Sequence, residues 1–325
     1  MTPMPAAVPQ NEALVPPHEA AERARGFEPP RSHGRFGYSA IVDRPHYRWP
    51  NGAGVAVYIG FNVEHFAFAE GLGSQLAPSR DGVDVLNYSW REYGNRVGVW
   101  RCIAEFDRLA LPTGAIVNTA LLDHCPQVVH ALAGRGDELI AHGHTNAHSQ
   151  GAWEELRERA LLRHCRDRLR DATGTTPRGW LSPWIAESAV TPDLLAEEGY
   201  GYTLNWCHDD QPTRLATRSA QPLWSVPYPQ ELNDIPAIAA RRLDVAAFAR
   251  MIVDNLDELL QDAVAAPRVM GIALHPYLIG QPYRLRAIRE ALEHVARTRD
   301  EGRIWMTTPG AIVDHVQALD VEQRA

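Results

Sequence analysis

Short apolar runs alternate with longer amphipathic segments from about residue 55 to the end of the chain. The apolar runs predict strands at 55–63, 115–118, 138–141, 179–181, 202–206, 223–226, 269–274 and 304–306. Segments with one apolar face predict helices at 96–109, 126–132, 153–171, 192–198, 245–260, 285–296 and 311–319. Strands joined by helices run parallel, so we predict an α/β fold. The number of strands favours a closed or nearly closed barrel over an open sheet.

Two segments lack this alternation. Residues 1–45 are rich in Pro, Ala and Glu without a steady period, which is typical of an extended N-terminal arm. The barrel then occupies residues 46–325. The segment 66–93 contains several glycines and little periodicity, so we expect a long loop there.

Composition narrows the class of protein. The chain has 325 residues, 45% of them hydrophobic, a formal net charge of -8 and no basic stripe, so we expect no nucleic-acid partner. No apolar run is long enough to span a membrane, and the N-terminus lacks a signal-peptide pattern. The four cysteines contain no CxxC pair and are expected to be free thiols. These features predict a cytoplasmic protein.

Polar groups follow three of the predicted strands. Glu64 ends the first strand, His142 and His144 follow the strand 138–141, and His275 follows the buried run 269–274. Parallel strands bring their carboxyl ends to one edge of the sheet, so these groups can converge there. An imidazole exchanges protons near neutral pH. The pattern therefore predicts an active site at this edge.

Each group also has a structural interpretation. Glu64 could pair with an arginine such as Arg96, and His275 could be a hydrogen-bonded core histidine. His142 and His144 would share one face of a strand, whereas His144 and His148 would share one face of a helix. Alternatively, these histidines only bond loop backbone. The residues alone leave these alternatives open.

A set of motifs resembles a known family. The motifs are Asn62-Val63-Glu64, Tyr93–Gly98, His142–Asn146, Arg178–Trp184, Asp209–Pro212, Pro227-Tyr228, Leu274–Pro276 and Ile279–Arg284. In order and spacing they resemble the polysaccharide deacetylase superfamily, near its allantoinase-like and peptidoglycan-deacetylase-like branch. The resemblance covers about residues 45–320.

The resemblance implies an irregular (β/α) barrel that hydrolyses a non-peptide carbon–nitrogen bond. Members of the family commonly bind a divalent metal through one aspartate and two histidines. A second acidic group acts as base, and a histidine late in the chain acts as acid. In this sequence the resemblance implies Glu64 as the catalytic base and His275 as the acid.

The chain departs from the family pattern at the metal. Asn62, Glu64 and His65 stand where two aspartates are usual, and Asn146 stands in the place of the second histidine ligand. The candidate metal ligands that remain are His65, His142 and His144. We therefore expect zinc to be weakly bound or absent. The Asn146 side-chain amide suits a planar amide substrate, because it can donate a hydrogen bond to the substrate and accept one from it.

The motifs also predict substrate-binding residues, which are Arg96, Asn146, Arg178, Trp180, Trp184 and Asp210. We predict a hydrolase of a small cytoplasmic amide, ureide or N-acyl sugar. The expected partners are a small-molecule substrate and further copies of the chain in a homo-oligomer, with no nucleic acid and no membrane. The alternative is a non-catalytic ligand-binding member of the same fold that has lost the metal site.

Overall fold

The computed structural model describes residues 32–79 and 82–324, with side chains described to residue 320. The chain divides into a short unit, Met1–Gly37, and a large unit, Tyr38–Ala325. Most of the predicted N-terminal arm lies outside the described residues. In the large unit, two single turns of 3-10 helix, η2 (Ile41–Asp43) and η3 (Pro50–Gly52), precede the first strand.

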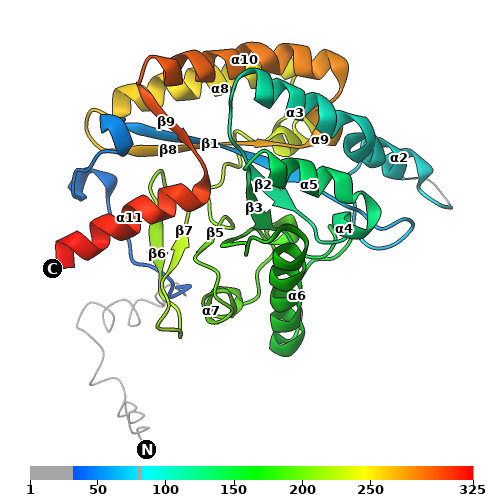
Figure 1. Cartoon of the computed structure of the whole chain (residues 1–325), viewed down its shortest axis with the longest axis horizontal. Helices are drawn as coiled ribbons and strands as arrows, with labels where there is room; N and C mark the ends of the chain where they lie inside the picture. Colours follow the sequence, from blue (N-terminus) through cyan, green and yellow to red (C-terminus); the bar gives the residue numbers. More distant parts are fainter. Residues whose placement is uncertain (1–31, 80–81, 325) are drawn as a thin grey trace, which may run out of the picture. The chain divides into compact units, whose positions relative to one another are not determined.

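The large unit is built on a curled mixed sheet that forms a half-barrel (Figure 1). The order of its strands is β6-β7-β5-β4-β3-β2-β1-β8, and β9 pairs with β1 beside β2. All pairs are parallel except β6 with β7. The strands are β1 (Val55–Val63), β2 (Gly114–Val117), β3 (Glu138–Ala141), β4 (Gly179–Trp180), β5 (Tyr202–Thr203), β6 (Thr213–Leu215), β7 (Leu223–Ser225), β8 (Arg268–Leu274) and β9 (Ile304–Thr307). The predicted α/β barrel-type fold is confirmed, in a distorted form.

The centre of the sheet explains its continuous apolar sequence. Every residue of β1 and of β8 is buried, because helices cover these strands and neighbouring strands flank them. The first half of β1 pairs with β9 and the second half with β2, so the sheet forks along this strand. Because all strands except β6 run parallel, their carboxyl ends lie on one side of the sheet.

Helices connect most of the successive strands as predicted, except from β5 to β6 and from β6 to β7. They are α2 (Val85–Tyr93), α3 (Val99–Arg108), α4 (Leu121–His124), α5 (Pro126–Gly134), α6 (Glu155–Thr173), α7 (Thr191–Glu197), α8 (Val245–Asp262), α9 (Pro276–Ile279), α10 (Pro282–Asp300) and α11 (Pro309–Arg324). The long helices α8 and α10 pack side by side over β1 and β8 (Figure 1). Gly174 ends α6 with a positive φ of 75°, as the sequence indicates.

The predicted loop 66–93 is wrong in its second half, which forms α2. The Asp84 carboxylate caps this helix by accepting a hydrogen bond from the backbone N–H of Asn87. The inward face of α2 contains polar residues, including Asn87, Arg91 and Glu92, so the usual apolar stripe is missing. A π-helical turn, η4 (Gly94–Gly98), joins α2 to α3, and the helix predicted from residue 96 therefore begins earlier.

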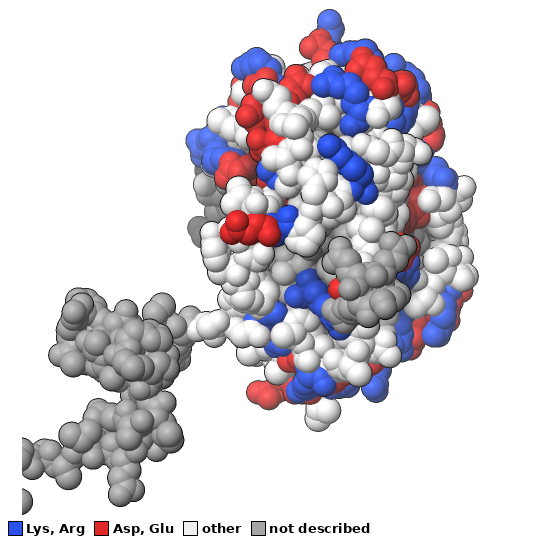
Figure 2. All heavy atoms as spheres, turned by 90° about the vertical axis from the view of Figure 1, so that its left-hand side faces the viewer, with Lys and Arg blue, Asp and Glu red and all other residues white. Residues whose placement is uncertain are grey.

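The distribution of charged side chains on the surface agrees with the lack of a basic stripe in the sequence. On the face in Figure 2, basic and acidic side chains lie interspersed rather than gathered by sign. Within the described part of the chain, no helix combines the length and apolarity needed to cross a membrane.

Two glycines bring η4 against the helix that follows His275. A Cβ on Gly98 would overlap the carbonyl oxygen of Pro276, and a Cβ on Gly280 would overlap the same oxygen and the backbone of Gly98. Only hydrogen fits at either position while the backbones stay in place. This contact fixes the loop after β8 against the helix after α2.

We predict that Gly98→Ala destabilises the fold by about 1–3 kcal/mol, because the added methyl group forces backbone apart. Gly134→Ala is the matched control, since a Cβ added at Gly134 would meet nothing within 4 Å. Urea denaturation followed by circular dichroism measures both. Equal stability of the two variants would contradict the packing argument.

Candidate active site

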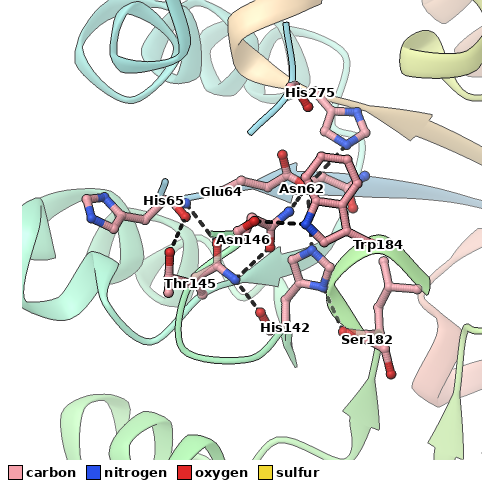
Figure 3. Close-up of polar contacts among 12 residues, drawn as sticks. Asn62, Glu64, His65, His142, Thr145, Asn146, Ser182, Trp184 and His275 are labelled. Atoms are coloured by element: carbon pink, nitrogen blue, oxygen red, sulfur yellow. Dashed lines mark hydrogen bonds and ion pairs between the residues drawn. The ribbon is translucent and has the colours of Figure 1, made fainter. Parts of the chain in front are cut away.

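A cavity of about 170 Å³ opens at the carboxyl ends of the parallel strands. Glu64 enters it from the end of β1, His142 from the end of β3 and His275 from the end of β8. Figure 3 shows these side chains converging from different strands. The three polar strand ends seen in the sequence therefore meet at one place.

The Glu64 carboxylate is the centre of this cluster and is buried. Its Oε1 accepts a hydrogen bond from Asn146 Nδ2 at 2.6 Å. The same oxygen lies 3.5 Å from the Nε2 atoms of His142 and His275 (Figure 3). Its Oε2 accepts a hydrogen bond from the Tyr277 hydroxyl at 2.9 Å. A buried carboxylate is costly without such partners, so these four groups stabilise its position.

A relay of amides fixes the orientation of Asn146. The backbone N–H of His65 can only donate, and it donates to Asn118 Oδ1 at 2.8 Å. The Asn118 amide nitrogen therefore points the other way, where it donates to Asn146 Oδ1 at 3.0 Å and to the carbonyl of His142. The nitrogen of Asn146 is left to face Glu64.

His275 is clamped by Asp234, which is fully buried. The imidazole Nδ1–H donates to Asp234 Oδ1 at 2.6 Å, and the backbone N–H of His275 donates to Asp234 Oδ2 at 2.7 Å. The two bonds hold the ring so that Nε2 points at Glu64. This is the arrangement of an orienting carboxylate behind a proton-transfer histidine.

The charge states of His275 and Glu64 depend on each other. Burial alone lowers the pKa of His275, but the carboxylates of Asp234 and Glu64 more than offset it and raise that pKa to about 10. Burial likewise raises the pKa of Glu64, yet the imidazoles of His275 and His142 hold it well below its usual range. At neutral pH the cavity therefore contains a His275 cation beside a Glu64 anion.

Of the six predicted substrate-binding residues, the structure places Asn146 and Trp184 at the cavity. The Trp184 Nε1–H donates to the backbone oxygen of Asn146 at 2.9 Å. Trp184 has a φ of 61°, which is rare for a residue with a large side chain. Such backbone strain is typical of functional sites and here holds the indole at the cavity wall.

The other four do not line the cavity. Arg178 precedes β4 and pairs with Asp314, and Asp210 lies 3.6 Å from Arg268 at the start of β8. Both positions are at the amino ends of strands, away from the site. The remaining two residues, Trp180 and Arg96, also lie outside the cavity lining.

Trp180 is completely buried in the core, and its indole donates to Ser182 Oγ at 2.9 Å. Arg96 is exposed and lies 3.5 Å from Glu92 rather than beside Glu64. The alternative that Arg96 neutralises Glu64 therefore does not hold. The groups that do so are the imidazoles and the amide described above.

The three predicted metal ligands are separated. His142 lines the cavity, and its Nδ1 bonds the carbonyl of Leu181 at 2.7 Å. His144 Nδ1 lies 3.0 Å from the Thr119 hydroxyl. His65 turns away from the cavity toward Glu92 and His124, and these three residues form a different cluster that could hold a metal ion.

Residues that hold the site in place but were not predicted from the sequence include Asn118, Asp234 and Tyr277. Asn118 follows β2 directly and has the same strand-end signal that identified Glu64 and His275. Tyr277 follows His275 by two residues. Asp234 directly precedes the π-helical turn η6 (Ile235–Ala240), which no sequence period marks, so only the fold reveals its contact.

Comparisons with known proteins agree with this geometry, although no family model matches the chain. The chain is 25% identical over 293 residues to a Schizosaccharomyces pombe protein named "Putative polysaccharide deacetylase", covering 80% of this chain and 89% of that protein. It is 21% identical over 283 residues to the Helicobacter pylori peptidoglycan deacetylase, covering 77% and 93%. Puue allantoinase superposes with a TM-score of 0.75 at 24% identity, covering 87% of this chain and 98% of that structure.

Over most of its length the chain is similar to proteins of the polysaccharide deacetylase superfamily. The proteins it resembles include one named as a deacetylase and one named as an allantoinase. The resemblance stated from the motifs is therefore confirmed.

The metal usual in this family does not fit the cavity. A ligand set would have to use Glu64, His142 and Asn146, but the Asn146 nitrogen points at the carboxylate and its oxygen accepts from Asn118. An amide N–H₂ is not a ligand, and the backbone of His65 fixes this orientation through Asn118. Two donors remain, fewer than the three protein ligands of catalytic zinc sites.

We predict that Asn146→His adds zinc binding at this cavity, because an imidazole replaces the wrongly oriented amide. Elemental analysis after dialysis should find one more zinc ion per chain in the variant than in the parent. Asn146→Gln is the control, because it keeps an amide. Equal zinc content in the histidine variant and the parent would contradict the ligand argument.

We predict that His275 stays protonated in the parent at pH 8, because its pKa is raised to about 10. In Asp234→Asn the main raising charge is lost while burial remains, so His275 should titrate at lower pH. Nitrogen NMR of labelled histidine measures this. The control is Asp257→Asn, which removes the partner of the surface residue His294, 2.9 Å away, and should leave His275 unchanged.

Proposed function

We propose that the protein hydrolyses a carbon–nitrogen bond in a small amide, ureide or N-acyl sugar, with Glu64 and His275 as the proton-transfer pair. The observation that carries the proposal is their proximity: Glu64 Oε1 and His275 Nε2 lie 3.5 Å apart at the wall of one cavity. A base and an acid that serve one bond must both reach the same substrate.

The proposed reaction needs one water molecule. Glu64 removes a proton from the water molecule while the water oxygen attacks the carbonyl carbon of the substrate. The carbon–nitrogen bond then breaks, and His275 donates its Nε2 proton to the leaving nitrogen. The products are a carboxylic acid and an amine, or the corresponding pair from a ureide.

Charge coupling supports this division of roles. Glu64 is a weak base while His275 is charged, because the imidazolium lowers its pKa. As the His275 proton moves to the leaving nitrogen, that positive charge disappears and Glu64 becomes more basic. The two transfers therefore favour each other. Afterwards the proton on Glu64 can return to His275 across the gap between them, which restores the starting state.

Further side chains of the site would position Glu64 and His275. Asn146 and Tyr277 hold the two oxygens of Glu64, and Asp234 holds His275. We propose that His142 and the indole of Trp184 contact the substrate, because both line the cavity. No metal is required in this scheme.

The cavity supports a small substrate. Its volume of about 170 Å³ suits a small molecule better than several linked sugar units. The cavity wall also contains the amides of Gln230 and Asn233, which could hydrogen-bond a substrate with several N–H and C=O groups. We propose a ureide or cyclic amide as the first class to test, and a cytoplasmic location.

We predict that His275→Ala and Glu64→Gln each lower kcat by ~10²–10⁴, the usual contribution of a general acid or base. The parent is first screened for hydrolysis against ureides, cyclic amides and N-acetyl sugars with a chelator present. His294→Ala, at a histidine outside the cavity, is the control and should keep the parental rate.

Parental rates in both catalytic variants would refute the assignment. Saturable ligand binding by the parent, without hydrolysis of any compound in the panel, would instead favour the alternative of a non-catalytic binding protein.

A further inference from the structure

A second cluster of metal-type ligands lies outside the cavity. His65, Glu92 and His124 place one ligand atom each within 4.8 Å of one another, and none of the three lines the cavity. They come from three elements: His65 follows β1, Glu92 lies on α2 and His124 ends α4. Figure 3 shows the His65 ring directed away from Glu64 and Asn146.

The distances between the ligand atoms suit a small ion. His124 Nε2 lies 3.0 Å from both oxygens of Glu92, and the rings of His65 and His124 are 4.6 Å apart between centroids. Ligand atoms on one zinc ion lie roughly 3–3.5 Å apart, because Zn–N and Zn–O bonds are about 2.0–2.2 Å long. Rotation of the His65 side chain would close the remaining gap.

A separate observation points to a missing ligand. His65 Nδ1 is buried and has no hydrogen-bond partner among the residues that the structure describes. A buried polar atom without a partner is rare and calls for an explanation. A metal ion bound through His65 Nδ1 would supply that partner.

We propose that His65, Glu92 and His124 bind a divalent transition metal, with zinc as the best match. Two imidazoles and one carboxylate are a known zinc ligand set, and hard ions such as magnesium prefer oxygen ligands. This site differs from the family's metal position, which would lie at Glu64 and His142 inside the cavity.

The position of His65 gives the site a structural role. Successive residues of an extended segment point to opposite sides, so His65 reaches the metal while Glu64 faces the cavity. The backbone of His65 also receives hydrogen bonds from Asn146 and Thr145 and donates one to Asn118. A metal at His65 would therefore tie α2 and α4 to the backbone that carries Glu64.

Arg96 is the charged group that competes for this cluster. It lies 3.5 Å from Glu92 Oε2, and its side chain is 75% exposed. An exposed ion pair of this kind contributes little, so a metal can displace it. Without metal, Glu92 contacts His124 Nε2 at 3.0 Å and pairs with Arg96.

The test measures zinc binding by the full chain after chelator treatment, using calorimetry and elemental analysis. The parent should bind one zinc ion. His65→Gln and His124→Gln should weaken binding by at least ~100-fold, since changes around a metal ligand alone cost 10–100-fold. His142→Gln, in the cavity, and His130→Gln, at an exposed histidine, should bind as the parent does.

Cobalt(II) provides a second readout, because four-coordinate cobalt absorbs strongly in the visible range. The absorption should appear in the parent and in His142→Gln, and disappear in His65→Gln and His124→Gln. Zinc should also raise the Tm of the parent but not that of the His124→Gln variant.

Two outcomes would overturn the proposal: no zinc bound by the parent, or zinc binding that depends on His142 and not on His65 and His124. If His65→Gln does not fold, Glu92→Gln takes its place. None of these measurements uses hydrolysis, so the result is independent of the proposed function.

Discussion

The burial of one carboxylate determines the arrangement of the whole site. Glu64 ends a strand that is buried along its full length, so its charge must be balanced by side chains rather than by water. Residues after β3 and β8 supply those side chains, and residues further out hold them in turn. The cavity exists because these donors approach the carboxylate from several directions and leave one open.

The fold was largely predictable because its signals are local. Continuous apolar runs and one-sided helices marked the central strands and most helices, since buried parallel strands and amphipathic helices have distinct periods. The second half of the segment 66–93 was missed because the inward face of α2 bonds through Asn87, Arg91 and Glu92 rather than through apolar side chains. The antiparallel strand β6 is only three residues long, too short for any period to appear.

The site was only partly predictable. The strand-end pattern placed Glu64, His142 and His275 together, because parallel strands share one edge. The pattern did not reveal that Arg178 and Asp210, both predicted to bind substrate, lie at the amino ends of strands and therefore away from the cavity. It also could not show that His65 faces away from Glu64, or that Asp234 lies behind His275, since both depend on how irregular segments return to the sheet.

The contact of Gly98 with Gly280 has a consequence for redesign of this protein. Each position accepts no side chain while the other backbone stays where it is, so neither can be changed alone. The loop that carries the acid is therefore closed to stepwise variation. The part of the wall formed by Trp184 and Ile185 is exposed or partly exposed. New substrate selectivity is most accessible from that wall, with the proton-transfer machinery left intact.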